Sequence, residues 1–193
     1  TLIQYRVNCN VTRELFINLK LDYKDLRKSF RKSYKPLISK GDRFFKGYKL
    51  KDKDSSILEE FKKLHYKAAG RKTRSEKSWE LLFDEIFNKK SSFYYCTDKE
   101  GLMVGGSIIM QNNFEALYAV AAYDRELFHL PIGHFLQDFI IKDLVKRKIT
   151  WYRLGRNFNE LDFDIPSKKE IQISKFKSGF STDSIANFRF SLS

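Results

Sequence analysis

A lysine near the C-terminus lies in a pattern that could hold a positive charge inside a site. Lys177 lies between Phe176 and the pair Ser178-Gly179, and Phe180 follows. The two phenylalanines would anchor the segment in the core, and the glycine would let the backbone turn. An ammonium held there could neutralise a phosphate or stabilise the negative charge that develops when an amine attacks a carbonyl. The alternative is a surface lysine on a terminal strand.

A second candidate lies where a strand ends at Tyr123 and a helix begins near Ile132. The free backbone N–H groups of Ile132, Gly133 and His134 would lie at the positive end of the helix dipole, which favours an anion. The connecting loop, LPIGH, is poor in glycine, so an ordinary strand–turn–helix with an early proline is an equal alternative. His134 is expected to cap or pack more often than to act as a base. Tyr123 could give a proton to a leaving group or be a structural aromatic.

A third candidate is a basic link between two expected helices. Arg71, Lys72 and Arg74 follow Gly70, and such side chains can clamp a phosphate or a carboxylate of a substrate. The alternative is a solvated loop between helices. The two cysteines, Cys9 and Cys96, are too few for a disulfide scaffold and form no metal-binding pattern with histidine. We therefore expect no metal and a reducing, cytoplasmic compartment.

The positive charge is concentrated in two windows. The net charge is +13. Over 23–46, nine basic residues accompany two acidic ones, and over 62–77 seven accompany one. Concentrated charge of one sign favours an anionic partner, such as a nucleotide, coenzyme A, a nucleotide-linked sugar, tRNA or an anionic membrane surface. The alternative is that the lysines merely solvate two helices.

The elements expected in the first half are mostly helical. A short strand is expected over 2–8, and a basic helix over 22–40 that Pro36 ends or kinks. A strand follows over 44–50. A helix capped by Asp54 or Ser55 should end at Gly70, and another should start at Ser75. Their expected buried faces are Ile57, Phe61, Leu64 and Ala68 in the first, and Trp79, Leu82, Phe83 and Ile86 in the second.

The hydrophobic period changes in the second half. Segments 92–97, 102–111 and 114–123 read as an antiparallel meander. A helix over 132–148 should turn Asp138, Lys142 and Lys146 outward, and a strand covers 151–154. The segment 171–180 reads as a weak terminal strand. The expected class is mixed α/β, with a central antiparallel meander and flanking helices, and no apolar run is long enough to span a membrane.

This order of elements and several local sequence segments resemble the Fem-type (FemAB-like) branch of the GNAT acyltransferase superfamily. The similar segments are FKKLHYKAAGRKTRS, KEGLMVGGSII, ALYAVAAYDRELFHLPIGHFLQDFIIKDLVKR and TWYRLGR, within about 26–180. The closing KFKSGF is similar to the family's FKxGFG, with Ser181 in place of the last glycine. The resemblance implies a GNAT-like fold, the donor's pyrophosphate at Ile132–His134, and Phe176-Lys177 at the donor end of the site.

The resemblance also implies an activity. The implied enzyme is an N-acyltransferase or aminoacyltransferase. It would pass an acyl group from acyl-CoA or aminoacyl-tRNA to an amine of a cell-envelope precursor, such as a peptidoglycan or nucleotide-sugar precursor. The acceptor's own amine is then the nucleophile. No tightly bound cofactor is expected. The expected partners are a small-molecule or nucleotide-linked acceptor and tRNA, with peripheral contact to an anionic membrane.

A non-catalytic binding module is the alternative, with its basic surface on RNA or an anionic membrane. A transferase needs a concave donor site where the strand ending near Tyr123 diverges from the strand at 151–154, whereas a binding module needs only an exposed basic surface. Fem-type proteins usually carry two such domains. We therefore expect 1–21 to be an N-terminal strand, a possible remnant of a preceding domain, and 22–193 to be the GNAT-like domain. Either a first domain is missing, or this relative works with one.

Overall fold

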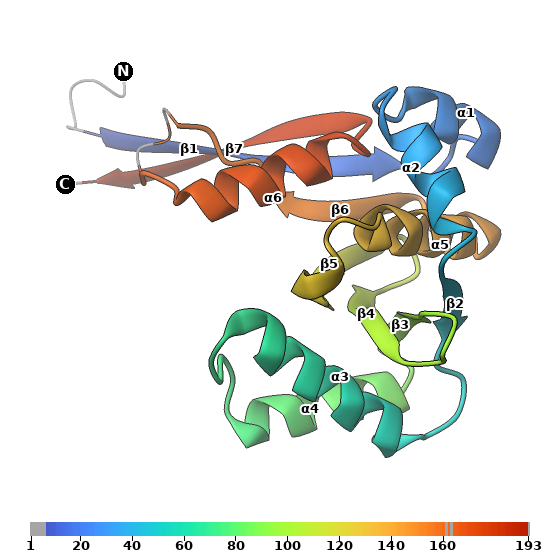
Figure 1. The fold of residues 1–193 in the computed structure, drawn as a ribbon. Helices are drawn as coiled ribbons and strands as arrows, with labels where there is room; N and C mark the ends of the chain where they lie inside the picture. The colour runs from blue at the N-terminus through green and yellow to red at the C-terminus, as the bar shows by residue number, and fades with distance from the viewer. Residues whose placement is uncertain (1–6, 161, 163, 193) are drawn as a thin grey trace.

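The strands form one mixed sheet in a computed structural model that describes residues 7–160, 162 and 164–192. The strand order is β2-β3-β4-β5-β6-β1-β7 (Figure 1). The predicted mixed α/β class is confirmed. The strands are β1 Val7–Asn18, β2 Lys46–Lys49, β3 Ser91–Thr97, β4 Met103–Gln111, β5 Glu115–Tyr123, β6 Trp151–Arg156 and β7 Asp183–Leu192. The helices are α1 Tyr23–Ser29, α2 Tyr34–Gly41, α3 Ser55–Ala69, α4 Glu76–Phe87, η2 Arg125–Leu127 (3-10), α5 Ile132–Lys146 and α6 Lys168–Ser178.

Two hydrophobic cores lie on the two faces of the sheet. In one, α3 and α4 pack against the meander β3-β4-β5 through Phe61, Trp79 and Phe93. In the other, α5 packs against the sheet together with α1 and α2, and Leu136 and Ile140 are fully buried there. The predicted antiparallel meander and the predicted packing of the 132–148 helix on one face are both confirmed.

Local signals set the ends of α3 and α4. The Asp54 side chain accepts a hydrogen bond from the Ser56 N–H at the start of α3. Gly70 ends this helix with a left-handed φ of 71°, a conformation that costs glycine little. The Ser75 side chain accepts from the Ser78 N–H and starts α4. These three predicted boundaries are confirmed.

The basic segment 22–40 forms two helices instead of one, and Pro36 does not mark the break. The chain leaves the helical path between α1 and α2, at residues 30–33. Pro36 lies in the first turn of α2, where its missing N–H would have had no helical partner.

Asp138 was predicted to face solvent, but its side chain is only 2% exposed. Its carboxylate accepts a hydrogen bond from the Tyr23 hydroxyl and pairs with the Lys142 ammonium at 2.8 Å. These partners compensate the cost of burying the charge and join α1 to α5.

The segment 171–180 is not a strand: residues 171–178 belong to α6, and 179–180 form the turn after it. This helix starts with a capping box in which the Ser167 and Glu170 side chains each accept from the other's backbone N–H. After α6 the chain forms β7, a strand that the sequence did not predict, which pairs with β1 over its whole length. The polar side chains of α6 and the exposed side chains of β7 explain why neither gave a clear hydrophobic period.

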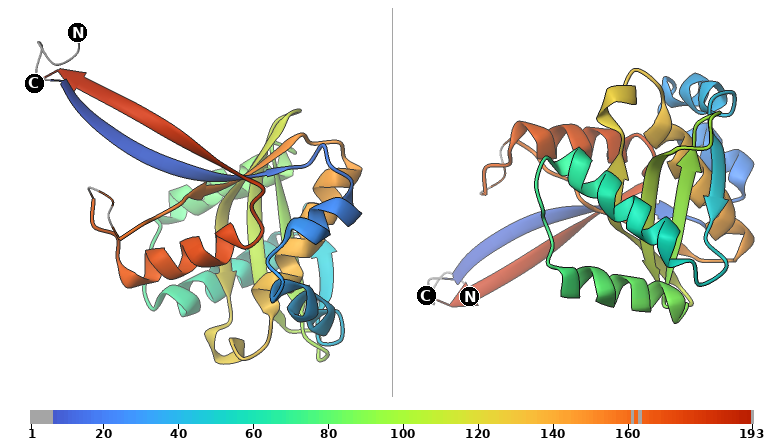
Figure 2. Two further views of the ribbon diagram at one scale, coloured as in Figure 1. Left: turned by 90° about the horizontal axis from the view of Figure 1, so that it is seen from above. Right: turned by 60° about the horizontal axis from the view of Figure 1, so that its bottom comes forward.

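The N-terminal strand is part of the same sheet. Residues 2–6 of the predicted 2–8 strand lie outside the described residues. The described strand, β1, pairs with β6 on one side and β7 on the other. Beyond β6 the two strands continue as a two-stranded ribbon that extends away from the rest of the protein (Figure 2). The domain boundary after residue 21 stays a prediction.

Candidate active site

A split in the sheet opens a large hollow in the described structure. β5 and β6 run parallel but pair only from Glu115–Leu117 to Trp151–Arg153. Beyond Leu117, β5 diverges from β6, as the sequence argument required of a donor site. The start of α5, the face of α6 and the end of α3 enclose the opening, which forms a cavity of about 1030 Å³.

Most of the predicted site residues line this one cavity. They are Tyr123, Ile132, Gly133, His134, Phe176, Lys177 and Arg74. Arg71 and Lys72 do not line it, because they lie exposed on the α3–α4 link, and only Arg74 of that trio turns toward the cavity. The structure thus brings together seven of the nine predicted residues.

Lys177 projects from the last turn of α6, not from a strand as predicted. Its Nζ lies 5.4 Å from the ring centroid of Tyr118. It also lies 3.5 Å from where a Cβ would stand at Gly155, a glycine with φ of 94°. No carboxylate of the described residues lies within ion-pair distance of it. Burial lowers the pKa of the Lys177 ammonium, because removal from water disfavours the charged form.

Tyr118 and Tyr123 meet at the cavity wall because β5 carries a bulge. Residues five apart in a regular strand face opposite sides of the sheet. The register shift between Ile108 and Ile109 leaves Ala119 without a partner on β4, and this extra residue returns Tyr123 to the side of Tyr118. The two hydroxyl oxygens lie 2.8 Å apart. Burial raises the pKa of both tyrosines, so both remain neutral hydroxyl donors at neutral pH.

His134 is part of an aromatic cluster. Its ring centroid lies 4.4 Å from that of Tyr34 and 5.2 Å from that of Phe176. Burial, with a smaller contribution from Arg31, lowers the pKa of His134 to about 4, so its ring is neutral at pH 7. A Cβ at Gly133 would lie 3.2 Å from the Phe176 ring. Phe176 therefore packs on the first turn of α5, where the sequence predicted an anion.

The charges around the cavity are all of one sign. Arg74, Arg125, Lys169 and Lys177 line it, and no aspartate or glutamate is among its described lining residues. None of the four cations forms an ion pair with a described carboxylate. A hollow that holds several unpaired cations favours a ligand that carries phosphate or carboxylate groups.

One face of α6 supplies cavity residues that the sequence analysis missed. Lys169, Gln172 and Ile173 line the cavity and share a helical stripe with Phe176 and Lys177. The capping-box pattern at 167–170, directly after Pro166, was the available signal for this helix. The sequence shows no clear amphipathic period here, because three of the five residues in this stripe are polar.

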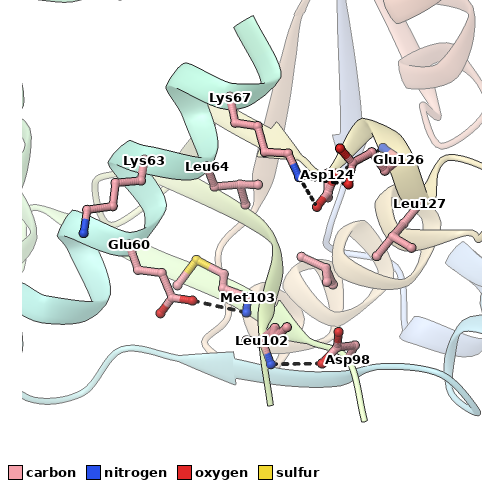
Figure 3. Close-up of a pocket in the computed structure, with 11 residues that line it drawn as sticks. Glu60, Lys63, Leu64, Lys67, Asp98, Leu102, Met103, Asp124, Glu126 and Leu127 are labelled. Carbon is pink, nitrogen blue, oxygen red and sulfur yellow. Dashed lines mark hydrogen bonds and ion pairs between the residues drawn. The ribbon is translucent and has the colours of Figure 1, made fainter. Parts of the chain in front are cut away.

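A second, smaller hollow of about 500 Å³ lies between α3, the β3–β4 turn and η2 (Figure 3). We call it the acidic groove, because Glu60, Asp98, Asp124 and Glu126 line it beside two lysines. Here one lysine is paired with two carboxylates. The Lys67 ammonium lies 3.1 Å from the carboxylates of both Asp124 and Glu126, and the Glu60 carboxylate accepts a hydrogen bond from a backbone N–H.

The described residues hold neither a metal-binding cluster nor a helix that could cross a membrane. No group of three or more histidine, cysteine, aspartate or glutamate side chains is arranged to hold a metal ion. No helix there combines the length and the apolar character that crossing a bilayer requires.

Comparison with known proteins shows the fold. No protein-family model matches the chain, and no curated protein matches it by sequence. Among solved structures, FemX is similar with a TM-score of 0.75 and 13% identity, over 90% of this chain and 59% of that chain. The C-terminal domain of a putative lysylphosphatidylglycerol synthetase from Agrobacterium fabrum has a TM-score of 0.69 and 12% identity, over 94% and 60%.

An aminoglycoside acetyltransferase from an uncultured soil metagenomic sample matches a smaller part. Its TM-score is 0.50 at 17% identity, over 56% of this chain and 74% of that one. The predicted fold is confirmed, because the chain folds like FemX over most of its length and like this acetyltransferase over a smaller part. The chain spans less than two thirds of the FemX and synthetase chains that it resembles.

Proposed function

We propose that this protein is an acyltransferase whose donor binds in the cavity between β5, α5 and α6. The donor is an acyl-CoA or an aminoacyl-tRNA, and the acceptor is an amine of a cell-envelope precursor, either a peptidoglycan or a nucleotide-sugar precursor. One observation carries the proposal: a cavity opens at the split between β5 and β6, and its cations have no described carboxylate partner. Both donor classes carry phosphates that such cations would neutralise.

The cavity wall also fits the chemistry of acyl transfer. The acceptor nitrogen attacks the donor carbonyl, and the carbonyl oxygen becomes an oxyanion. Lys177 supplies a positive charge that stabilises this oxyanion more than the neutral ground state. The hydroxyl pair of Tyr118 and Tyr123 supplies a proton to the departing sulfur or oxygen. The proton that the amine loses returns to the tyrosinate, directly or through water, so that both hydroxyls are restored.

The names of the similar structures make both donor classes reasonable. One is a lysylphosphatidylglycerol synthetase domain and another an aminoglycoside acetyltransferase. Because similarity at this level of identity shows the fold alone, the choice of donor for this chain rests on the cavity. The ring of Phe176 on the first turn of α5 reduces the room for a pyrophosphate there. We therefore expect the donor's phosphates at Arg74, Arg125 and Lys169 instead.

The basic surface of α1 and α2 supports the proposed partners. Lys24, Lys28 and Lys32 are exposed there, on the segment with the larger charge excess. Such a surface would contact the phosphates of tRNA or an anionic membrane. We place the protein in the cytoplasm on this account. The same surface is what a non-catalytic binding module would need, so a catalytic assay must separate the two.

The test is a transfer assay with each donor. Purified protein is incubated with acetyl-CoA or with tRNA charged with labelled amino acids, together with UDP-linked peptidoglycan precursors and amino sugars. The proposal expects label to appear in the acceptor from one donor class, at a rate that Lys177→Ala reduces. Tight tRNA binding without transfer from any donor would contradict it and favour the binding module.

A further inference from the structure

The last turn of α6 is held by the loop that joins α1 to α2. The Arg31 guanidinium donates to the Lys175 carbonyl at 3.1 Å and to the Ser178 hydroxyl at 3.2 Å. The Arg31 backbone N–H donates to the Gly179 carbonyl at 2.9 Å. The last carbonyls of a helix have no partner within it, and a cation there also interacts favourably with the helix dipole. Arg31 therefore caps α6 from outside the helix.

Tyr34 completes this cap. Its hydroxyl donates to the Phe176 carbonyl at 3.0 Å, and its ring lies under the Arg31 guanidinium at 5.1 Å. The fit is close, because a Cβ at Gly179 would lie 2.2 Å from the Tyr34 ring. The Tyr34 ring also packs on Phe180 at 4.9 Å between centroids. The turn is thus fixed by hydrogen bonds from the α1–α2 loop and by a hydrogen bond and ring packing from the first residue of α2.

Lys177 lies inside the turn that these contacts fix. Arg31 and Tyr34 donate hydrogen bonds to backbone carbonyls on both sides of it. These are the carbonyls of Lys175 and Phe176 before it and of Gly179 after it. Its ammonium lies over the Tyr118 ring without a described carboxylate partner. A lysine in this position would gain hydration by turning outward, so it must be held by its backbone. Ser174, whose hydroxyl bonds the Asn157 side chain at 2.8 Å, anchors α6 one turn earlier.

We infer that Arg31 and Tyr34 are positioning residues, which fix the last turn of α6 and so hold the Lys177 ammonium at the cavity wall. Neither lines the cavity, so their effect on Lys177 passes through α6. The consequence for turnover rests on the proposed function, whereas the consequence for the position of Lys177 does not. The loop between two basic helices is thereby coupled to the site.

The first test follows the Lys177 ammonium itself by NMR titration of isotope-labelled lysine, assigned with Lys177→Arg. The variants are Arg31→Ala, Arg31→Lys and Tyr34→Phe, with Lys32→Ala as the matched control on the same loop. In the parent and in Lys32→Ala, we expect Lys177 to titrate below the other lysines. In Arg31→Ala the titration midpoint of Lys177 should move toward that of the other lysines. Arg31→Lys should restore the parent's midpoint in part, since an ammonium cannot reproduce the planar guanidinium that bonds two acceptors at once.

The second test is the split between kcat and KM in the transfer assay. Arg31→Ala should lower kcat by about 10- to 100-fold, because a misplacement of about 1 Å has effects of that order, and leave KM within about twofold. Tyr34→Phe keeps the ring, so it carries the test if Arg31→Ala does not fold. An unchanged Lys177 titration in both variants overturns the inference. A shifted titration in a protein that transfers nothing supports it and refutes the proposed function.

Discussion

The cavity and the acidic groove adjoin each other but differ in whether their charged side chains form ion pairs. They share α3 and the end of β5, so that Lys67 and Asp124 line the groove while Ala68 and Arg125 line the cavity. In the groove, Lys67 pairs with two carboxylates. In the cavity, four cations line the wall without a described counter-ion. Like charges gathered in one hollow destabilise a fold unless a ligand neutralises them. We therefore propose that the cavity binds an anion, whereas the ion pairs of Lys67 in the groove join α3 to the segment around η2.

The largest expected effect comes from Lys177, a cavity cation whose pKa is lowered by burial. Lys177→Ala should lower the rate of acyl transfer by about 100-fold, because loss of one oxyanion-stabilising group typically costs about that much. Lys177→Arg should recover only part, since a planar guanidinium does not replace a point charge. Steady-state transfer measures the effect, with circular dichroism as the control for folding.

The matched control is Lys175→Ala on the same helix. The Lys175 side chain is exposed and does not line the cavity. Its removal should leave transfer within about twofold. Equal losses in Lys175→Ala and Lys177→Ala would mean that the charge of α6 matters and its position in the cavity does not.

A smaller effect concerns the pH dependence of stability. The folded protein holds the pKa of His134 at about 4, below its ordinary value of 6.5. The unfolded chain therefore binds more protons between these values, and stability falls as pH drops from 6.5 to 4. His134→Phe keeps an aromatic ring beside Tyr34 but cannot bind this proton. Over this pH range its free energy of unfolding should fall by about 1–2 kcal/mol less than that of the parent, after allowance for the ring's partial exposure.

Urea unfolding at pH 7, 5.5 and 4 measures this difference, with His129→Gln at an exposed site as the control. Parallel losses of stability in the parent and in His134→Phe would show that the ring is not the titrating group.

The smallest effect is expected in the groove. Lys67→Gln removes an exposed ammonium from two carboxylates, and exposed ion pairs contribute little to stability. We expect a slight fall in Tm and transfer within about twofold of the parent. A loss of transfer as large as that of a cavity variant would remove the distinction between the two hollows.

The strongly periodic elements could be predicted from sequence. The stripe of Trp79, Leu82, Phe83 and Ile86 and the meander over 92–123 gave clear periods of a helix and of strands, and the structure has both. α6 and β7 could not be predicted in this way, because α6 places Lys169 and Gln172 on its inner face and β7 buries little. Their structure depends on caps and on pairing with β1, which is distant in sequence.

The sequence indicated which residues line the site better than it indicated how they are arranged. Residue types and the family resemblance pointed to Lys177 and Tyr123. The bulge at Ala119 that brings Tyr118 to Tyr123 leaves no sign in the sequence, because a bulge depends on register between strands. The pairing of Asp138 with Tyr23 could not be predicted for a similar reason. The helical period places Asp138 on the solvent side, and its contact with Tyr23 depends on how α1 packs on α5.

The most direct test of the central claim is anion binding by charge-matched variants. Each of Arg74→Gln and Lys169→Gln removes one cavity charge, and Lys63→Gln removes one groove charge, so the net charge changes equally. Binding of coenzyme A and of tRNA is measured between 50 and 200 mM salt, the range in which phosphate contacts lose most affinity. The cavity variants should bind one of these probes about tenfold more weakly, with a shallower salt dependence, and Lys63→Gln should bind as the parent does. Equal weakening by all three variants would contradict the account.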